Sequence, residues 1–327
     1  MPQRMRVCNT DEYNNSLKKK GDIFSILNQA TEFWLHCDVE GIEKSKYVYS
    51  QIFINLMGCL RYLLRFPFRQ LAGFLDSYLK HNGLSHLPSP DYSTLCRRMK
   101  KEKLPFKDFR TAQEKVKGRY VKLVIDSSGI SIYATGGGHG KKNATTRRHK
   151  HYDQVRKLHV LLDLETGNVL DIEMTEGTGS DHLSGERLIE NCDLPIESVY
   201  GDAAYDRKPF RRRCCQKGAA QIIPPQLKAR MRKPKKTDPP DLWTERNEAV
   251  RLMHQASTRE EGRKQWKEQV NYGKRAKVEG HFHRFKKAFG FSFMSVSEEG
   301  RFNELVYKNI LLNAYNQFSK PLFQKID

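Results

Sequence analysis

The sequence predicts an α/β fold, in which a mixed β-sheet packs with helices and follows a helical N-terminal region. Three observations predict it. Short apolar segments of strand length recur from residue 117 onward, and segments with helical periodicity alternate with the later strands. Residues 47–104 instead show only helical periodicity. The chain has 327 residues and is 38% hydrophobic, which suffices for one large domain or two to three smaller ones.

The order of the strands indicates the architecture of the core. Residues 158–164 and 169–174 flank a Glu-Thr-Gly-Asn segment that is typical of a hairpin turn. The remaining expected strands and helices are, in order, 121–125, 130–134, 181–191 (helix), 199–202, 209–218 (helix) and 220–223. An antiparallel trio, a helix and further strands alternating with helices is the order of an RNase H-like domain.

This order sets the expected division of the chain. We expect 117–318 to form this RNase H-like domain, with 224–270 as a basic and helical insertion, and 319–327 as a tail. A glycine-rich stretch within the domain, 136–148, is expected to be a basic loop. The histidines at 139, 149, 151 and 159 lie in or near it and are expected to face solvent or DNA.

The N-terminal part is expected to comprise a leader of mixed polarity, 1–46, and a helical region, 47–116. Within this region, the segment that begins at Ser89 opens with a helix-start signal of Ser and Asp around a proline. Short polar residues and then Arg97 and Arg98 follow. This layout favours a helix-turn-helix-like DNA-binding element, in which polar groups reach base edges and arginines reach phosphates. Small helical bundles without DNA-binding function share the same pattern.

The chain is strongly basic. Lys and Arg number 58 against 38 acidic residues, for a net charge of +20. A folded protein with such a surplus most often binds a polyanion, and nucleic acid is the commonest one; the alternatives are a solubility bias or a membrane-surface binder. Between residues 205 and 236, twelve residues are basic and one is acidic. This segment is expected to contact phosphates through Arg211, Arg212 and Arg213, or else to be a solvated loop.

The apolar segments and the cysteines indicate the cellular compartment in which the protein is expected. The longest apolar candidate, 52–64, is interrupted by Arg61, so no segment is long enough to span a bilayer. The first residues lack the apolar run of a secretory signal. The seven cysteines are scattered without a Cys-x-x-Cys pair, which argues against a disulfide framework and structural zinc. We therefore expect a cytoplasmic protein with reduced thiols and no membrane partner.

Two aspartates follow apolar strand-like segments that are far apart in the sequence. Asp126 follows 121–125, and Asp202 follows 198–201. A carboxylate that closes a buried strand is costly unless it binds a metal ion or a hydrogen-bond partner. Either aspartate alone is more simply a turn or helix-capping residue. Two of them followed by a glutamate on a late helix weaken that explanation.

The late helix carries four polar residues on one stripe, namely Tyr272, Arg275, Glu279 and Lys286. At about 100° per residue, their spacings of three, four and seven place them within roughly a 60° arc. Beside this stripe runs an apolar strip formed by Val278, Phe282, Phe285 and Phe289. The helix is therefore expected to pack on a core with its polar stripe at the edge. The simpler alternative is an amphipathic helix with a solvated charged face.

Carboxylates placed in this way suit phosphodiester chemistry with two metal ions about 3.5–4 Å apart, one activating the attacking oxygen and the other stabilising the leaving oxygen. Mg²⁺ prefers such hard oxygen ligands. Asp126, Asp202 and Glu279 are expected to meet at one edge of the sheet, because segments distant in the sequence can share a sheet.

The motifs resemble those of the DDE transposases of bacterial insertion sequences. The stripe on the late helix matches their Tyr-x2-Arg-x3-Glu-x6-Lys signature at every position. The segments 124–126 and 201–206 are similar to the blocks around the first and second aspartates of that family. Two further segments, 13–17 and 90–93, resemble the insertion-sequence group numbered five. The resemblance covers residues 10–318.

The resemblance implies an RNase H-like core that binds two Mg²⁺ or Mn²⁺ ions through Asp126, Asp202 and Glu279. It implies that Tyr272, Arg275 and Lys286 contact the DNA backbone near the cleaved end. The implied reaction is hydrolysis at the terminal inverted repeats of the element, followed by transfer of the 3′-ends into target double-stranded DNA. A homodimer that bridges two ends, in a bacterial cytoplasm and associated with the nucleoid, is also implied.

The sequence departs from the family pattern at two places, and two other functions stay open. His281 and His283 follow the glutamate closely and are expected to perturb a nearby metal site. The long segment between Asp202 and Glu279 is expected to hold an inserted subdomain, in which Trp266 is a packing residue. A structure-specific nuclease with the same core is one alternative function. A DNA-binding protein whose catalysis has decayed is the other.

Overall fold

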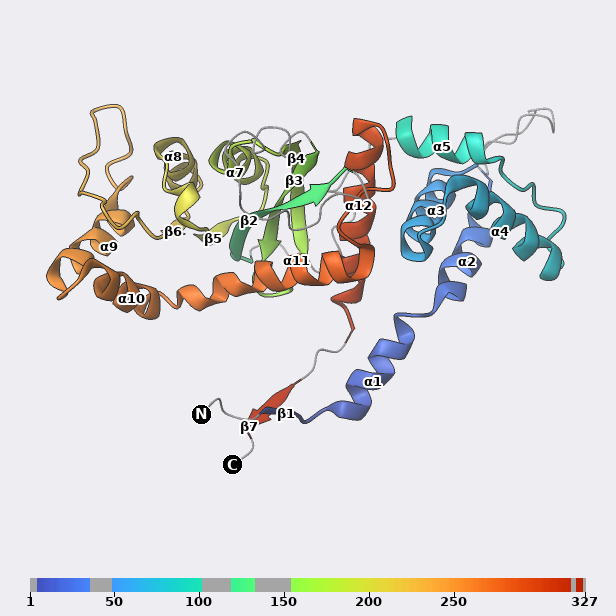
Figure 1. The fold of residues 1–327 in the computed structure, drawn as a ribbon, viewed down its shortest axis with the longest axis horizontal. Coiled ribbons are helices and arrows are strands. Elements are labelled where there is room, and N and C mark those ends of the chain that lie inside the picture. The colour runs from blue at the N-terminus through green and yellow to red at the C-terminus, as the bar shows by residue number, and fades with distance from the viewer. Residues whose placement is uncertain (1–4, 36–48, 102–118, 133–153, 319–321, 326–327) are drawn as a thin grey trace, which may run out of the picture. The chain divides into compact units, whose positions relative to one another are not determined.

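The computed structural model describes residues 5–35, 49–101, 119–132, 154–318 and 322–325. The chain forms two compact units, of which unit one comprises Met1–Leu104 with Met294–Asp327, and unit two comprises Pro105–Phe293 (Figure 1). Residues 294–318 thus belong to unit one, whereas the sequence grouped them with the catalytic region. The functional division of the chain stays a prediction. The expected basic loop, with its histidines at 139, 149 and 151, lies outside the described residues.

The centre of unit two is a five-stranded mixed sheet. Its strands are β2 (Val121–Ser131), β3 (Val155–Asp163), β4 (Val169–Glu176), β5 (Ile196–Tyr200) and β6 (Ala220–Ile222), in the spatial order β4-β3-β2-β5-β6. β2, β3 and β4 pair antiparallel, whereas β5 pairs parallel with both β2 and β6. This arrangement is the RNase H-like fold that the order of the elements predicted. The expected strands 121–125 and 130–134 were wrong in one respect, since β2 is a single strand through both Asp126 and Ile130.

Helices cover the sheet of unit two (Figure 1). On one face, α7 (Asp181–Glu190) contacts β2, β3 and β4, and α8 (Lys208–Gln216) packs on α7. Their shared core includes Val121, Leu123 and Ile125 of β2. Because successive side chains of a strand point to opposite faces, Val124 and Asp126 belong to the other face. The helix α11 (Ala276–Phe289) contacts β2 as well.

One glycine sets how closely α7 approaches the sheet. A Cβ atom on Gly185 would lie 2.7 Å from Phe210, 2.8 Å from Tyr205 and 3.0 Å from Ile125. All three neighbours are buried in the core of unit two. Gly280 on α11 is the opposite case, because no atom lies within 4 Å of a Cβ built there.

The amphipathic character predicted for the late helix is confirmed. Its apolar strip is buried, at relative exposures of 8% or less for Val278, Phe282, Phe285 and Phe289. The segment before it folds as two helices, α9 (Thr244–Gln255) and α10 (Arg259–Gln269), which pack on each other. Trp266 is buried on α10 and lies 6.0 Å from the Tyr272 ring, so it is a packing residue.

Unit one is helical. Its helices are α1 (Thr10–Lys19), α2 (Ile23–Glu32), α3 (Gln51–Leu64), α4 (Phe68–His81), α5 (Tyr92–Lys101) and α12 (Glu298–Tyr315), and a short ribbon pairs β1 (Met5–Val7) with β7 (Phe323–Lys325). The expected leader is not separate from this core, because Leu27, Ala30 and Trp34 are buried with α3, α4 and α5. Within this unit, a Cβ on Gly58 would lie 2.3 Å from the Tyr307 ring, so glycine permits the close packing of α3 on α12.

Across the ranges that the structure describes, no helix is both long enough and apolar enough to cross a bilayer.

Replacing Gly185 by alanine is expected to lower the free energy of unfolding by about 1–3 kcal/mol, because the added methyl group overpacks the contact of α7 with β2. Gly280→Ala is the matched control in the same unit and is expected to stabilise by about 0.5–1 kcal/mol, because alanine is the better helix former and space is open. Denaturant unfolding of both variants measures the difference. Equal destabilisation by the two substitutions would contradict the close packing at Gly185.

Candidate functional site

The two aspartates lie side by side because of the parallel pairing of β2 with β5. Val124 is paired with Tyr200 in this ladder. Asp126 and Asp202 each come two residues later, so both carboxylates follow the last paired residues of adjacent parallel strands. They are close enough for the charge of Asp202 to affect the pKa of Asp126. The sequence predicted that Asp126 ends its strand, but β2 continues past it. Asp126 instead lies where β5, the parallel partner of β2, ends.

Asp202 has the local role of a helix cap. Its Oδ1 accepts a hydrogen bond at 2.8 Å from the backbone N–H of Ala204 in the 3₁₀-helix η2 (Ala203–Tyr205). A backbone N–H likewise donates to Asp126, from Ser127 to Oδ1 at 2.9 Å. In each carboxylate one oxygen is thus held by the backbone, which fixes the orientation of the group.

A single arginine joins the first aspartate to the glutamate. Arg275 Nη1 donates to Asp126 Oδ2 at 2.7 Å, and Arg275 Nη2 donates to Glu279 Oε1. The side chains of Arg275 and Asp126 are 18% and 19% exposed, whereas that of Glu279 is 59% exposed. The structure therefore brings together Asp126, Arg275 and Glu279, with Asp202 beside Asp126, just after the neighbouring strand.

The signature stripe is not one continuous α-helix. Tyr272 to Arg275 form a 3₁₀-helix, η3, after Asn271 in the left-handed conformation (φ 51°), and α11 begins at Ala276. The tighter turn redirects Tyr272, whose hydroxyl donates to the backbone oxygen of Gly201 at 3.0 Å, directly before Asp202. Lys286 is partly buried two turns beyond Glu279, about 10 Å along the helix, and is therefore not brought to the carboxylates.

The electrostatics of the edge follow from its partial burial. Burial and the neighbouring charge of Asp202 raise the pKa of Asp126, while the Ser127 N–H and Arg275 oppose the shift without cancelling it. Burial opposes the charge of Arg275, but Tyr272, Asp126 and Glu279 outweigh it and raise the pKa of the guanidinium. Burial raises the pKa of Tyr272 to about 12, so the phenol is neutral and acts as a hydrogen-bond donor.

Two cations near Tyr272, Lys267 and Arg263, were not predicted as site residues. Lys267 Nζ lies 5.2 Å from the centre of the Tyr272 ring, and Arg275 Cζ lies 6.0 Å from it. Arg263 is close enough to affect the pKa of both Tyr272 and Lys267. Arg263 and Lys267 are four residues apart on the highly polar α10. That spacing is visible in the sequence, but only the packing of α10 beside η3 places these cations at the site.

The three consecutive arginines of α8 have different surroundings. Arg211 is fully buried and donates to Asp206, Gln221 and the backbone oxygen of Ile223 at 2.8–3.1 Å. It is a structural residue, and the prediction that Arg211 contacts DNA is not kept. Asp206 also accepts from the buried Arg246 at 2.9 Å.

Arg212 and Arg213 are partly exposed and pair with carboxylates of the chain. The partner of Arg212 is Asp238, and that of Arg213 is Glu190 at 3.3 Å. Their role in DNA binding stays a prediction.

Arg97 and Arg98 lie in unit one, on α5. Arg97 is exposed, whereas Arg98 is half-buried and donates to the backbone oxygen of Tyr49 at 3.2 Å. The loop between α4 and α5 spans residues 82–91, longer than the three to four residues of a standard helix-turn-helix. DNA contact by this element also stays a prediction.

A second polar cluster lies on the α7 face of β2. Ser127 Oγ donates to Asp181 Oδ1 at 2.7 Å, and Lys157 Nζ donates to the same oxygen at 3.0 Å. His159 was expected to face solvent or DNA, but it is fully buried and bonds with Thr175 Oγ1 through Nε2 at 2.8 Å. Burial lowers the pKa of His159 to about 4, although Asp181 opposes the shift. Ser127 and His159 are paired across β2 and β3, which places them on the same face.

The other histidines bear on the expected metal site. His281 is buried on the apolar side of α11, 6.4 Å from the Phe285 ring, and His283 is exposed. By position, His281 comes two residues after Glu279 and lies on a different face of α11, whereas His283 comes four residues after it and lies on the same face. His283 is therefore the nearer of the two to Glu279, and its effect on metal binding stays a prediction.

The donor set suits a hard divalent cation by its chemistry, because three carboxylates approach one edge and carboxylate oxygens are preferred Mg²⁺ ligands. Burial and the charges of Asp126, Asp181 and Asp202 raise the pKa of the Tyr205 hydroxyl, which lacks a hydrogen-bond partner within the described chain. No ready-made group of three His, Cys, Asp or Glu side chains occurs in the described ranges. Arg275 accounts for this, because its guanidinium bonds to Asp126 and Glu279.

An RNase H-like sheet with two strand-borne aspartates and a helical glutamate at one edge defines a class of nucleic-acid-processing enzymes. Comparison with protein families assigns the chain more closely. A family model described as Transposase DDE domain matches residues 117–314, more than half of the chain, and a second model with the same description matches residues 18–135. The chain belongs to the DDE-domain transposases. DNA is the partner that this family implies, and its members generally use divalent metal ions.

The buried histidine makes the stability of unit two depend on pH. Because the pKa of His159 is about 4 in the folded chain against 6.5 in the unfolded chain, the unfolded chain binds more protons between these values. Stability is therefore expected to fall as the pH drops from 6.5 toward 4. Over this pH range, the free energy of unfolding of the wild type should fall by about 2–3 kcal/mol more than that of His159→Gln. The control is His254→Gln, at an exposed position of α9. Parallel pH profiles of all three proteins would contradict the burial of a neutral His159.

Proposed function

We propose that the protein is a DNA transposase that binds terminal inverted repeats, cleaves DNA at the element ends and transfers the 3′-ends into target DNA. We further propose that it belongs to the insertion-sequence group numbered five. The observation that supports the proposal is that Asp202 follows the strand beside Asp126, while Arg275 bonds to both Asp126 and Glu279. The family to which the chain belongs supports the same reaction.

In this proposal Asp126, Asp202 and Glu279 hold two Mg²⁺ or Mn²⁺ ions. When bound, the ions would activate the attacking water or 3′-hydroxyl and stabilise the leaving oxygen. Backbone N–H groups already hold Oδ1 of both aspartates, so the orientation of each second oxygen is set without further ordering; that of Asp126 bonds to Arg275. Glu279 is the most exposed of the three, and its hydrogen-bond partner among the described residues is Arg275, which makes it the ligand that adjusts most easily.

The cations beside Tyr272 are proposed to bind the DNA backbone near the cleaved bond. Arg275, Lys267 and Arg263 gather around the Tyr272 ring, and a guanidinium binds two phosphate oxygens in the same way as two carboxylate oxygens. A DNA phosphate that binds Arg275 would free the carboxylates of Asp126 and Glu279 to bind the metal ions. Lys286, Arg97, Arg98, Arg212 and Arg213 are proposed to contact DNA further from this bond.

A homodimer in the DNA complex and association with the bacterial nucleoid belong to the same proposal and rest on the family resemblance. Two other functions use the same fold. A structure-specific nuclease would cut branched DNA without preference for particular ends. A decayed relative would bind DNA without metal-dependent cutting.

The decisive experiment is cleavage of DNA that carries the natural flanks of the gene, with and without Mg²⁺ or Mn²⁺. The wild type is expected to nick at defined flank positions only with metal. Asp126→Asn, Asp202→Asn and Glu279→Gln should each reduce cleavage by about 10³-fold or more while DNA binding persists, because a metal ligand is lost. Glu248→Gln is the matched control, since Glu248 is exposed and pairs with Arg251 on α9.

The outcomes separate the three functions. Cutting of branched DNA irrespective of its ends would support the nuclease. Tight binding without cleavage under any metal condition would support the decayed relative. Undiminished cleavage by one of the purified variants would remove that residue from the proposed ligand set.

DNA binding is expected to weaken steeply with salt, because counterions are released from each neutralised phosphate at a slope of about −0.9 per contact. Lys267→Met should reduce the magnitude of the slope by about one. Lys122→Met is the control, because Lys122 pairs with Glu197 near the start of β2. Titrations with labelled DNA over a range of salt concentrations measure the slopes. A flat dependence for the wild type would argue against backbone contact.

A further inference from the structure

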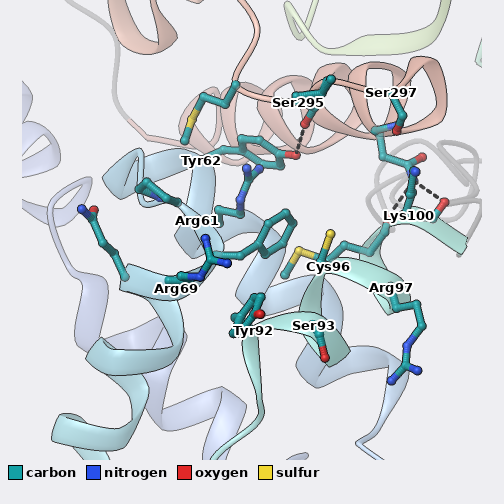
Figure 2. Close-up of a pocket in the computed structure, with 18 residues that line it drawn as sticks. Arg61, Tyr62, Arg69, Tyr92, Ser93, Cys96, Arg97, Lys100, Ser295 and Ser297 are labelled. Atoms are coloured by element: carbon teal, nitrogen blue, oxygen red, sulfur yellow. Dashed lines mark hydrogen bonds between the residues drawn. The ribbon is translucent and has the colours of Figure 1, made fainter.

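Unit one contains a cavity of about 1000 Å³ (Figure 2). Its walls come from the end of α3, the start of α4, α5, and residues 294–303 around the start of α12. All of the lining residues belong to unit one, whereas the carboxylates of the candidate site belong to unit two. Its size is at the upper end of the range of about 300–1,000 Å³ that is usual for small-molecule sites.

A buried arginine with spare hydrogen-bonding capacity borders this cavity. Arg61 is only 3% exposed, yet its Nε and Nη1 have no hydrogen-bond partner among the described residues. Its guanidinium carbon lies 4.0 Å from the centre of the Phe68 ring and 4.6 Å from that of Tyr62. The aromatic faces stabilise the charge but do not accept its N–H groups in the plane of the guanidinium. A buried charge of this kind is costly until an anion supplies acceptors.

A buried carboxylate that is close enough to affect the pKa of Tyr62 is already engaged. Glu304 accepts hydrogen bonds from Lys308 Nζ at 2.6 Å and from the backbone N–H groups of Met294 and Ser295 at 2.9–3.1 Å. The positive charge of Lys308 balances that of Glu304, so the charge of Arg61 is left for a ligand. None of the described residues that line the cavity is Asp or Glu.

The remaining walls combine further cations with flat apolar surfaces. Arg69, Arg97 and Lys100 also line the cavity, and Arg69 lies 4.6 Å from the centre of the Tyr92 ring. Figure 2 shows Arg61, Tyr62, Arg69 and Tyr92 gathered around the same space. The lining is more apolar than polar overall, with Phe68 and Met99 among its members. An inorganic anion would satisfy the cations but would leave these apolar walls uncovered.

We propose that this cavity binds one nucleotide unit, with the phosphate on Arg61 and the base against the aromatic wall of Phe68 and Tyr92. A nucleotide joins a dianionic or monoanionic phosphate to a flat ring, which is the combination that the walls require. Two sources share this chemistry: a nucleotide unstacked from a DNA strand, and a free mononucleotide. The proposal does not depend on the cleavage reaction proposed for unit two.

The test is calorimetric titration of the full-length protein in EDTA with dAMP, inorganic phosphate and deoxyadenosine as separate probes. The wild type is expected to bind dAMP more tightly than either of the other two. Arg61→Met should weaken dAMP binding by about ten-fold or more, because a charge-assisted hydrogen bond is lost while the apolar stem is kept. Arg65→Met is the matched control, with the same loss of charge at an exposed position just after α3.

A second variant keeps the proposal testable if Arg61→Met does not fold. Tyr92 is 39% exposed, so Tyr92→Leu should fold normally and weaken dAMP binding by about five-fold or more through lost stacking. Far-UV circular dichroism and thermal unfolding report the integrity of each variant.

Competition distinguishes the two sources of the nucleotide. If a single-stranded oligonucleotide displaces dAMP, and its own binding weakens in Arg61→Met, the site takes nucleotides of DNA. If dAMP binds but the oligonucleotide does not displace it, the site takes free nucleotides. Equal affinity for inorganic phosphate and dAMP would overturn the proposal in favour of a simple anion site. Unchanged dAMP binding in both folded variants, or no binding of dAMP to the wild type, would overturn it outright.

Discussion

Arg275 donates to Asp126 and to Glu279 at once, and the carboxylate edge of unit two depends on this sharing. Carboxylates that approach each other in a partly buried site repel, and one of them would take up a proton without a nearby cation. The pKa of Asp126 is raised even with Arg275 present. The guanidinium thus counteracts the effect of burial on the pKa of Asp126, and its two hydrogen bonds orient Asp126 and Glu279. In the proposed reaction, metal ions and a DNA phosphate would together take over its two roles.

The large positive charge of the chain has several distinct uses. Arg211 and Arg246 are buried around Asp206 and hold α8 and α9 to the segment after the second aspartate. Arg61 is held by aromatic rings beside a cavity in unit one. Lys267 is one of the cations that lie beside Tyr272 at the candidate site. A basic residue count therefore indicates a polyanionic partner, but burial decides which of the cations can reach one.

Local patterns predicted much of the fold correctly. Alternation and a turn sequence located the hairpin of β3 and β4, and helical periodicity located the buried strip of α11 that contains Phe285, because both depend only on short-range geometry. The sequence did not show that β2 continues through Asp126, since a strand paired on both sides tolerates a polar residue where its parallel partner ends. It also misplaced His159, because a histidine in a basic stretch gives no local sign of burial.

The sequence by itself determined the order of the elements, the family motif and the chemical types at the site, since these are properties of residue identity and spacing. Tertiary structure decided which residues meet. The parallel register of β2 and β5 places Asp202 beside Asp126, and the 3₁₀ turn before α11 directs Arg275 to a carboxylate 149 positions earlier in the chain. Packing also removed Arg211 from the surface and left Arg61 with unused donors. Such outcomes depend on long-range contacts and on the environment of each charge, neither of which is encoded in local spacing.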